Sequence, residues 1–439
     1  MFAACAVLAL TTSRRNSITV DEFGNLPRGL HIWHDRDYSL DAETTPLASM
    51  LAALPVTLSE SVDLTYRSNL PVTPWTIGEQ FMRNNAARYQ HIYDLARIAS
   101  ILALLATCAG VWGLARALYG RAGAFLALVV AIVVLNLAYM SLPFASVPFG
   151  DLTFATPTMR RLMSVVPNWL PSPFPMEFLR GLDAQFSEAP YDAYLLGTFN
   201  TTGFWNYYLV GVLVKTPEPI LLLALAALTF WQRLSPREIP LLVVAVGAFV
   251  VTSLVGHKNI GMRYVLFVAP LVAIWIGRIA TAPLWHTRPR LVRRGVAVLC
   301  AWLIAVTLLS WPHYLAYFNA ASGGADNGHA YLLDSNLDWG QDLITLRDYM
   351  AREHIDAIDL AYFGRVDPKA IYGINYTPFW DTIGHRHVVI SANFLWGRGY
   401  GIYGTGRALA ERDQFRTFLS VTPAAILGHS LYVYDLAAR

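Results

Sequence analysis

SITVDEF, residues 17–23, follows the first apolar run of the chain and contains two adjacent carboxylates, Asp21 and Glu22. A carboxylate just outside a membrane span can act as a general base on a hydroxyl when a good leaving group is held nearby. Acidic residues also favour the first turn of a helix, so the pair can instead simply cap the helix that follows. Either interpretation makes this stretch the point around which the rest of the chain is arranged.

The composition indicates a membrane protein. Of the 439 residues, 55% are hydrophobic and only 14% are charged, and the mean hydropathy is +0.39, which is too apolar for an ordinary soluble protein of this length. The net charge of +3 is small, so we do not expect nucleic acid as a partner. Cys5, Cys108 and Cys300 lie in apolar runs without paired spacing, which argues against a disulfide framework and a metal site.

The apolar runs predict an α-helical polytopic protein with about seven spans. The first run, residues 1–13, is shorter than the roughly 20 residues that a spanning helix needs, and we interpret it as the remnant of a first span. The other runs lie at about 98–115, 123–142, 208–230, 239–256, 264–280 and 295–311.

The distribution of arginine predicts the orientation of these spans. With alternate crossings, the arginines of the short loops 116–121, 233–237 and 278–294 fall on one side, which should be the cytoplasm. The loops 14–95 and 144–205 and the C-terminal part would then lie outside the cytoplasm. Loop 144–205 is rich in proline and aromatic residues, and we expect it to cover the membrane face without regular helix or central strand.

The sequence divides into a transmembrane domain, residues 1–311, and a small α/β domain outside the membrane, residues 312–439. Leu343, Leu346 and Met350 have helical spacing within residues 342–353. Three runs rich in β-branched and aromatic residues predict strands; they are 357–363, 387–394 and 425–434.

Two cationic turns are expected on the same outward side as Asp21. Lys215 stands at the end of a long apolar run, where two prolines break the helix, and a cation there usually has an anionic partner, such as a phosphate. Lys215 can also extend to the lipid headgroups or pair with Glu218. The second turn contains Lys258 and Arg263. Two cationic turns and two carboxylates predict a site for a lipid phosphate that carries a transferable group.

The stretch DSNLDWGQD, residues 334–342, places Asp334, Asn336 and Asp338 at every second position and ends on Asp342. This spacing is like the start of a calcium loop, but the glycine and the bidentate glutamate that such a loop needs are missing. We therefore expect a hydrogen-bonded turn, at which the outer domain contacts the membrane part or an acceptor substrate, and no metal.

Several stretches together resemble the C superfamily of multi-spanning glycosyltransferases (GT-C). TVDE at 19–22, Gly29 with DRD at 35–37, and ETTPL at 43–47 are similar to the first outer loop of the protein O-mannosyltransferases and the lipid A aminoarabinose transferase. A bacterial subgroup of this family is resembled by four later stretches: 207–217, 259–264, 313–319 and 334–342. The resemblance covers nearly the whole chain.

The resemblance implies an inverting sugar transfer from a polyprenyl phosphate to a hydroxyl at the outer face of the bacterial inner membrane. Asp21, with Glu22 beside it, then corresponds to the catalytic base. The basic turns with Lys215, Lys258 and Arg263 correspond to those that hold the donor phosphate. Lipid-linked sugar and membrane lipid are the implied partners, and no further cofactor is implied.

The chain also departs from this family. Asn25 and TTPL at 44–47 stand where members usually have a histidine and a His-Pro-Pro-Leu pattern. Residues 120–128 look like the start of the third span and 129–139 like a much later one, so intervening spans and a second outer loop with its own acid are missing. A degenerate relative that binds lipid phosphate or a glycan without catalysis is therefore the alternative hypothesis. A transporter is disfavoured, because the ionisable groups gather at one face.

Overall fold

The computed structural model describes residues 2–36, 40, 46–67, 71–136, 160, 161, 164, 192–229, 234–255, 259–282, 287–406 and 410–438. Most of the predicted cover, residues 144–205, lies outside these ranges, as does Lys258.

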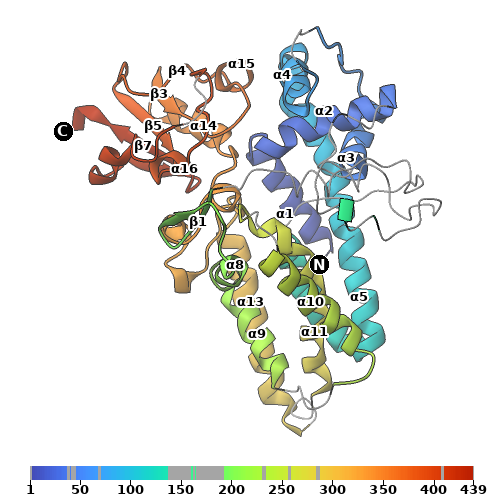
Figure 1. Ribbon diagram of the computed structural model, residues 1–439. Coiled ribbons are helices and arrows are strands. Elements are labelled where there is room, and N and C mark those ends of the chain that lie inside the picture. The colour runs from blue at the N-terminus through green and yellow to red at the C-terminus, as the bar shows by residue number, and fades with distance from the viewer. Residues whose placement is uncertain are drawn as a thin grey trace.

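The N-terminal part is helical. Its elements are α1 (Phe2–Arg15), α2 (Val20–Asp35), α3 (Pro46–Ser59), α4 (Pro74–Asn84), the 3₁₀ helix η1 (Ala86–Arg88) and α5 (Tyr89–Asn136). Figure 1 shows α2, α3 and α4 above a bundle into which α1 and α5 run.

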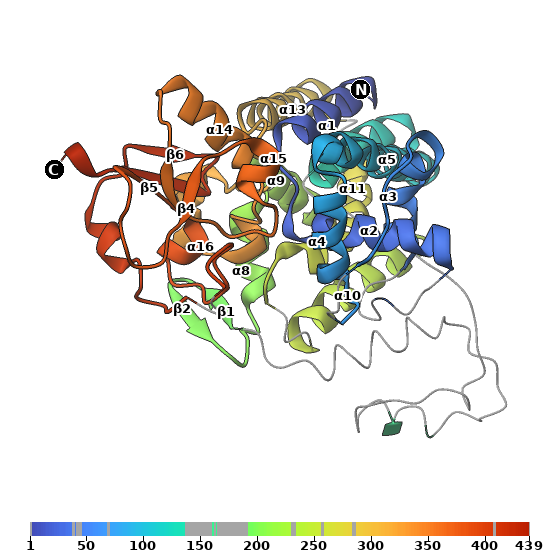
Figure 2. The same ribbon diagram turned by 90° about the horizontal axis from the view of Figure 1, so that it is seen from above.

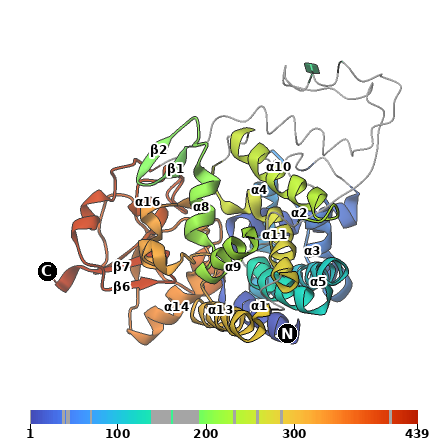
Figure 3. The same ribbon diagram turned by 90° about the horizontal axis from the view of Figure 1, so that it is seen from below.

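The middle part begins with a short antiparallel pair, β1 (Ala193–Leu195) and β2 (Thr198–Asn200). The remaining elements are α8 (Tyr207–Lys215), α9 (Glu218–Leu228), α10 (Ile239–Val255), η4 (Met262–Val268), α11 (Ala269–Ile276), η5 (Gly277–Thr281) and α13 (Pro289–Leu309). Seen from below, α9, α11 and α13 lie beside α1 and α5 (Figure 3).

Within the described ranges, three helices are long and apolar enough to cross a membrane: Ala86–Ala127, Met262–Thr281 and Pro289–Leu309. The pair α8 and α9, bent by 112°, would be a fourth if it is one span. These apolar helices agree with a helical membrane protein. Their exposed leucine and valine side chains, such as Leu225, Val243 and Val298, are suited to a lipid environment.

The expected count of about seven spans is wrong. The first run forms a helix of only 14 residues, α1, and the run 239–256 forms one of 17 residues, α10. The runs 98–115 and 123–142 both enter α5, which leaves helical geometry at Gly120 with a φ of 72° and a ψ of −171°. Glycine adopts this positive φ without a side-chain clash, which explains the break at that position.

The C-terminal part contains a five-stranded mixed sheet in the order β4-β3-β5-β7-β6. Its strands are β3 (Ile358–Ala361), β4 (Tyr376–Pro378), β5 (His387–Ser391), β6 (Ala425–Leu427) and β7 (Leu431–Asp435). The short helices around it are η6 (Ala320–Ser322), η7 (Ala325–Ala330), η8 (Asp334–Asn336), α14 (Leu343–Arg352), α15 (Pro368–Tyr372), α16 (Ala392–Leu395), η9 (Arg416–Ser420) and η10 (Leu436–Ala438).

The predicted helix in 342–353 is confirmed as α14, and the run 357–363 contains β3. The run 387–394 forms β5 up to Ser391 and then enters the short helix α16. The run 425–434 is not one strand but an antiparallel hairpin, β6 and β7. Gly428 and His429 turn the chain there with φ angles of 57° and 64°, which a continuous strand does not contain.

The sheet is covered on both faces because alternate residues of its strands enter different cores. Leu360, Val389 and Val433 pack in one core with α14 and with residues of α2, α4 and α5, such as Phe23. Val388, Ile390 and Tyr434 pack in a second core with Phe394 and Phe418. The sheet therefore shares a core with the N-terminal helices, and Figure 2 shows the two parts side by side from above.

Candidate functional site

The stretch 17–20 is held against the segment 339–341 by backbone contacts. The amide of Ser17 donates to the carbonyl of Gln341 at 2.9 Å, and the amide of Val20 donates to the carbonyl of Trp339 at 3.1 Å. The Ser17 hydroxyl also donates to the carbonyl of Gly340 at 2.7 Å. These bonds place the first turn of α2, with its two carboxylates, against the C-terminal part.

Glu22 caps the helix that contains it. The Thr19 amide, at the N-cap of α2, donates to Glu22 Oε2 at 3.0 Å, which satisfies one of the amides that a helix start would otherwise leave unpaired. The capping role considered for the acidic pair is therefore confirmed for Glu22.

Arg97 of α5 binds the same carboxylate. Its Nε donates to Glu22 Oε1 at 2.6 Å and its Nη2 to Glu22 Oε2 at 2.7 Å, and the two side chains are 18% and 7% exposed for Glu22 and Arg97. Burial alone would raise the pKa of the Glu22 carboxyl, but the charge and hydrogen bonds of Arg97 hold this pKa below its ordinary value. Glu22 thus has a structural partner in α5.

Asp21 forms an ion pair with Arg263 of η4. The Asp21 side chain is 40% exposed and that of Arg263 is 30% exposed, so both remain accessible to a ligand. The Arg263 guanidinium lies 5.2 Å from the centre of the Trp339 ring and 5.4 Å from that of Tyr264, and these rings restrict its position. Asp21 and Arg263, both predicted from sequence, are thus brought together.

Asp334 lies near this pair. Its carboxylate is 2.8 Å from Arg398 Nη2, and its amide donates to the side chain of Asn393 at 2.7 Å. Burial raises the pKa of Asp334, and the positive charges of Arg398 and Arg263 oppose this. The backbone φ of Asp334 is 62°, a left-handed conformation that aspartate tolerates better than most residues.

Lys215 ends α8, and its ammonium binds protein carbonyls. Nζ donates to the carbonyl of Leu315 at 2.7 Å and to that of Asn336, and it lies 4.6 Å from the centre of the Phe318 ring. These contacts tie α8 to the segments 313–319 and 334–342. The lysine that was predicted to bind phosphate therefore binds backbone carbonyls. We call this contact region, where α8 meets the segments 313–319 and 334–342, the joint between the helical part and the C-terminal part.

Asn336 makes three hydrogen bonds at the same joint. Its Oδ1 accepts from the amide of Met262 at 3.0 Å, and its Nδ2 donates to the hydroxyl of Tyr207 at 2.8 Å and to the carbonyl of Leu333 at 2.9 Å. Because Met262 precedes Arg263, Asn336 links the position of Lys215 to that of the Asp21–Arg263 pair.

We expect Asn336→Ala to lower the free energy of unfolding by about 2 kcal/mol, since the partly buried Met262 amide and the buried Tyr207 hydroxyl would lose their partner. The Tyr207→Phe control removes only one of these bonds and should cost about 1 kcal/mol. Denaturant titration of the purified protein in detergent measures both values. Equal stability of Asn336→Ala and the unaltered protein would show that these bonds contribute nothing to the joint.

Asp338 and Asp342 are buried, with 1% exposure each. Asp338 accepts a hydrogen bond from the Ser391 hydroxyl and one from the Gly340 amide at 3.0 Å. Asp342 accepts from the Ser430 hydroxyl at 2.7 Å and lies 3.2 Å from His313 Nδ1. Both carboxylates therefore hold the turn in place, and neither is exposed to an acceptor substrate.

Burial raises the pKa of Asp338 to about 7, and the nearby carboxylates of Asp342 and Asp334 add to this effect. The folded protein keeps this proton up to neutral pH, whereas the unfolded chain loses it near pH 4. The contribution of Asp338 to stability is therefore full at low pH and declines by about 1.4 kcal/mol per pH unit as the pH rises toward 7.

The isosteric Asp338→Asn variant is expected to remove this dependence, so that the decrease in stability from pH 5 to pH 7 becomes smaller by about 2 kcal/mol. The amide keeps an oxygen for the Gly340 amide and can donate to Ser391. Unfolding of both proteins at the two pH values measures the effect. A decrease of the same size in both would contradict a proton held by Asp338 up to neutral pH.

The predicted residues that the structure describes thus fall into four groups, one of which is the buried pair Asp338 and Asp342. Asp21 and Arg263 form an accessible pair with Asp334 close by. Lys215 and Asn336 lie in the joint, where Lys215 donates to the carbonyl of Asn336. Glu22 turns toward Arg97. No group of three or more His, Cys, Asp or Glu side chains that could hold a metal is found within the described ranges.

Sequence reasoning missed Arg97, Arg398 and Trp339. Arg97 could have been found, because it lies where the chain enters a long apolar run, and an arginine there usually has a partner. Arg398 and Trp339 give no such signal, since nothing local distinguishes them from other residues of the C-terminal part.

Comparisons with known proteins identify no relative: no family model, no curated protein and no solved structure matches the chain.

Proposed function

We propose that this chain is a membrane glycosyltransferase that moves a sugar from a polyprenyl phosphate to a hydroxyl acceptor, with Asp21 as the base. The observation that carries the proposal is the accessible ion pair between Asp21 and Arg263, two residues 242 positions apart. A base for the acceptor and a cation for a phosphate, side by side, are what this reaction requires.

In the proposed reaction, Asp21 accepts the proton of the acceptor hydroxyl while the hydroxyl oxygen attacks the anomeric carbon of the sugar. The bond between this carbon and the phosphate oxygen breaks, and the electron pair leaves with the polyprenyl phosphate. Arg263 exchanges its contact with Asp21 for the phosphate and stabilises the developing negative charge. The incoming oxygen and the leaving phosphate lie on opposite faces of the sugar, so the configuration inverts.

The position of the pair agrees with a lipid-linked donor. Arg263 lies in η4, at the start of the apolar segment Met262–Thr281, and Asp21 lies beside the C-terminal part. A lipid phosphate at the membrane surface would reach Arg263, and a polar acceptor would approach from the side of the sheet. As part of the proposal, the C-terminal part lies outside the cytoplasm of a bacterial cell, with the spans in the inner membrane.

Binding without catalysis is the second candidate, and the contacts of Glu22 and Lys215 favour it. Glu22 is occupied by Arg97, and the Lys215 ammonium by two backbone carbonyls. Of the predicted base and phosphate ligands that the structure describes, Asp21 and Arg263 alone remain accessible. In this case the pair would bind a lipid phosphate or a glycan and transfer nothing.

The test is transfer of labelled sugar by membranes that carry the chain, with a panel of polyprenyl phosphate donors that differ in the sugar. Incorporation into a hydroxyl acceptor with inversion at the anomeric carbon is expected. Membranes with a correctly inserted protein that bind the donor but transfer no sugar would refute the transferase and leave the binding function.

A further inference from the structure

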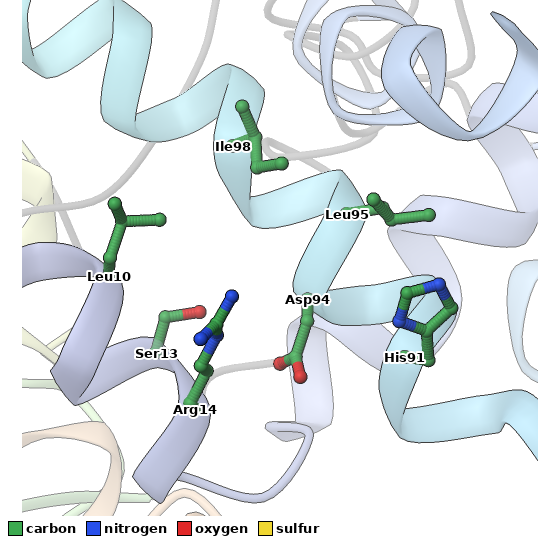
Figure 4. Close-up of a pocket in the computed structure, with 7 residues that line it drawn as sticks. All are labelled: Leu10, Ser13, Arg14, His91, Asp94, Leu95 and Ile98. Carbon is green, nitrogen blue, oxygen red and sulfur yellow. The ribbon is translucent and has the colours of Figure 1, made fainter. Parts of the chain in front are cut away.

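A cavity of about 180 Å³ lies between α1 and α5, apart from the Asp21–Arg263 pair. This is roughly ten times the space that one water molecule needs. Figure 4 shows Ser13 and Arg14 of α1 on one side of it and His91 and Asp94 of α5 on the other, with the Arg14 and Asp94 side chains directed toward the same space.

The lining of the cavity is graded in polarity. Leu10, Leu95 and Ile98 lie on the side of the bundle, where α5 continues as an apolar helix. Arg14, His91 and Asp94 lie on the side of the N-terminal polar loop. This gradient matches an amphiphile whose charged headgroup is near the membrane surface and whose chains extend along the helices.

Two oppositely charged side chains of the cavity, Arg14 and Asp94, are suited to a ligand that carries one negative and one positive group. Arg14 makes no hydrogen bond or ion pair within the described ranges, but its positive charge interacts electrostatically with the Asp94 carboxylate. The contacts of Asp94 to Gln90 at 3.0 Å and to Arg97 at 3.6 Å both use Oδ1, so Oδ2 makes no hydrogen bond or ion pair within the described ranges, and the side chain is 25% exposed. His91 lies 3.4 Å from Glu60, which is its own acidic neighbour. The other two charged side chains of the cavity, Arg14 and Asp94, carry opposite charges.

We propose that this cavity binds the headgroup of a phospholipid that carries a primary ammonium, with the phosphate on Arg14 and the ammonium on Asp94. A phosphate without an ammonium would place a further negative charge beside the Asp94 carboxylate, which has Arg97 at 3.6 Å as its one ion-pair partner within the described ranges, and like charges this close repel each other. A quaternary ammonium has no N–H to donate to this carboxylate. The acyl chains would lie along Leu10, Leu95 and Ile98.

Native mass spectrometry of the purified full chain, titrated with short-chain lipids in detergent, tests the assignment. We expect dihexanoyl phosphatidylethanolamine to bind about tenfold more tightly than dihexanoyl phosphatidylglycerol or the uncharged diacylglycerol. Equal binding of the ethanolamine and glycerol lipids would overturn the role of Asp94. Equal binding of diacylglycerol would overturn the headgroup site altogether.

Matched variants locate the site. Arg14→Gln should weaken binding of phosphatidylethanolamine about tenfold. Arg15→Gln, at the neighbouring exposed arginine that does not line the cavity, should change it less than about twofold. Equal losses in both variants would show a general surface charge effect and refute the site. Because both side chains are exposed, the thermal unfolding of both variants should match that of the unaltered protein.

Free phosphoethanolamine distinguishes the lipid from a soluble ligand of the same headgroup chemistry. We expect it to compete only at concentrations about 100-fold above those of the lipid, since it lacks the chains that contact the apolar side. Equal affinity for the two would overturn the lipid and leave a site for a soluble phosphoamine. None of these outcomes depends on sugar transfer, so the cavity and the proposed transferase are tested separately.

Discussion

Membranes that carry the Asp21→Asn variant are expected to transfer sugar about 10²–10⁴ times more slowly than membranes with the unaltered chain. Asparagine has nearly the same shape as aspartate and can remain beside Arg263, but its amide oxygen cannot take the proton of the acceptor hydroxyl. The measurement is the initial rate of labelled sugar transfer, at saturating donor and equal amounts of inserted protein.

The control is Asp35→Asn at the opposite end of the same helix. The Asp35 carboxylate is 45% exposed and contacts His31 and His34, so its loss should leave the rate within about twofold. The Asp21 ion pair is accessible, and its removal should change the free energy of unfolding by less than about 1 kcal/mol. A rate that survives in Asp21→Asn would contradict the assignment of the base.

Glu22→Ala is expected to lower the free energy of unfolding by about 3 kcal/mol. This substitution removes the carboxylate that accepts two hydrogen bonds from Arg97, and the guanidinium, which is 7% exposed, loses its nearest counter-charge. The Asp94 carboxylate, 3.6 Å from Arg97 Nη1, remains as the more distant counter-charge. The substitution also removes the acceptor for the Thr19 amide at the start of α2. Denaturant titration in detergent, followed by tryptophan fluorescence, measures the loss.

Glu79→Ala is the matched control, since Glu79 pairs with Arg83 one helical turn away and both are exposed. Its loss should cost no more than about 0.5 kcal/mol. A double-mutant cycle with Arg97→Met isolates the pair from the cap. If the two single changes are additive, the ion pair contributes nothing and the cost of Glu22→Ala comes from the helix cap.

The two neighbouring carboxylates therefore have different predicted effects, Asp21 on activity and Glu22 on stability. The sequence presents them as one acidic pair and offers capping or base catalysis for both. Successive residues of a helix point about 100° apart, so the first turn of α2 directs Asp21 to η4 and Glu22 to α5. Which neighbour stands on each side is a property of the packed structure.

Several features follow from local sequence alone. Thr19 and Glu22 have the spacing of a helix cap, and the helix begins between them at Val20. The apolar runs form helices, and the spacing of Leu343, Leu346 and Met350 forms α14. These predictions succeed because hydrogen bonds and side-chain periodicity within a few residues decide them.

Two other features of the fold differ from what the sequence predicted. The number of spans was overestimated, because helix length and the break at Gly120 decide which apolar runs can cross a bilayer. The run 425–434 reads as one strand, but the positive φ angles of Gly428 and His429 fold it into a hairpin.

The sequence by itself determined a helical membrane protein, a mixed α/β part after residue 311 and the helix that begins at the acidic pair. Only the tertiary structure decided that Asp21 meets Arg263 across 242 positions, that Glu22 is held by Arg97, and that Lys215 binds backbone carbonyls. Hydropathy and capping act over one or two helical turns, whereas the partner of a charged group depends on which segments pack together.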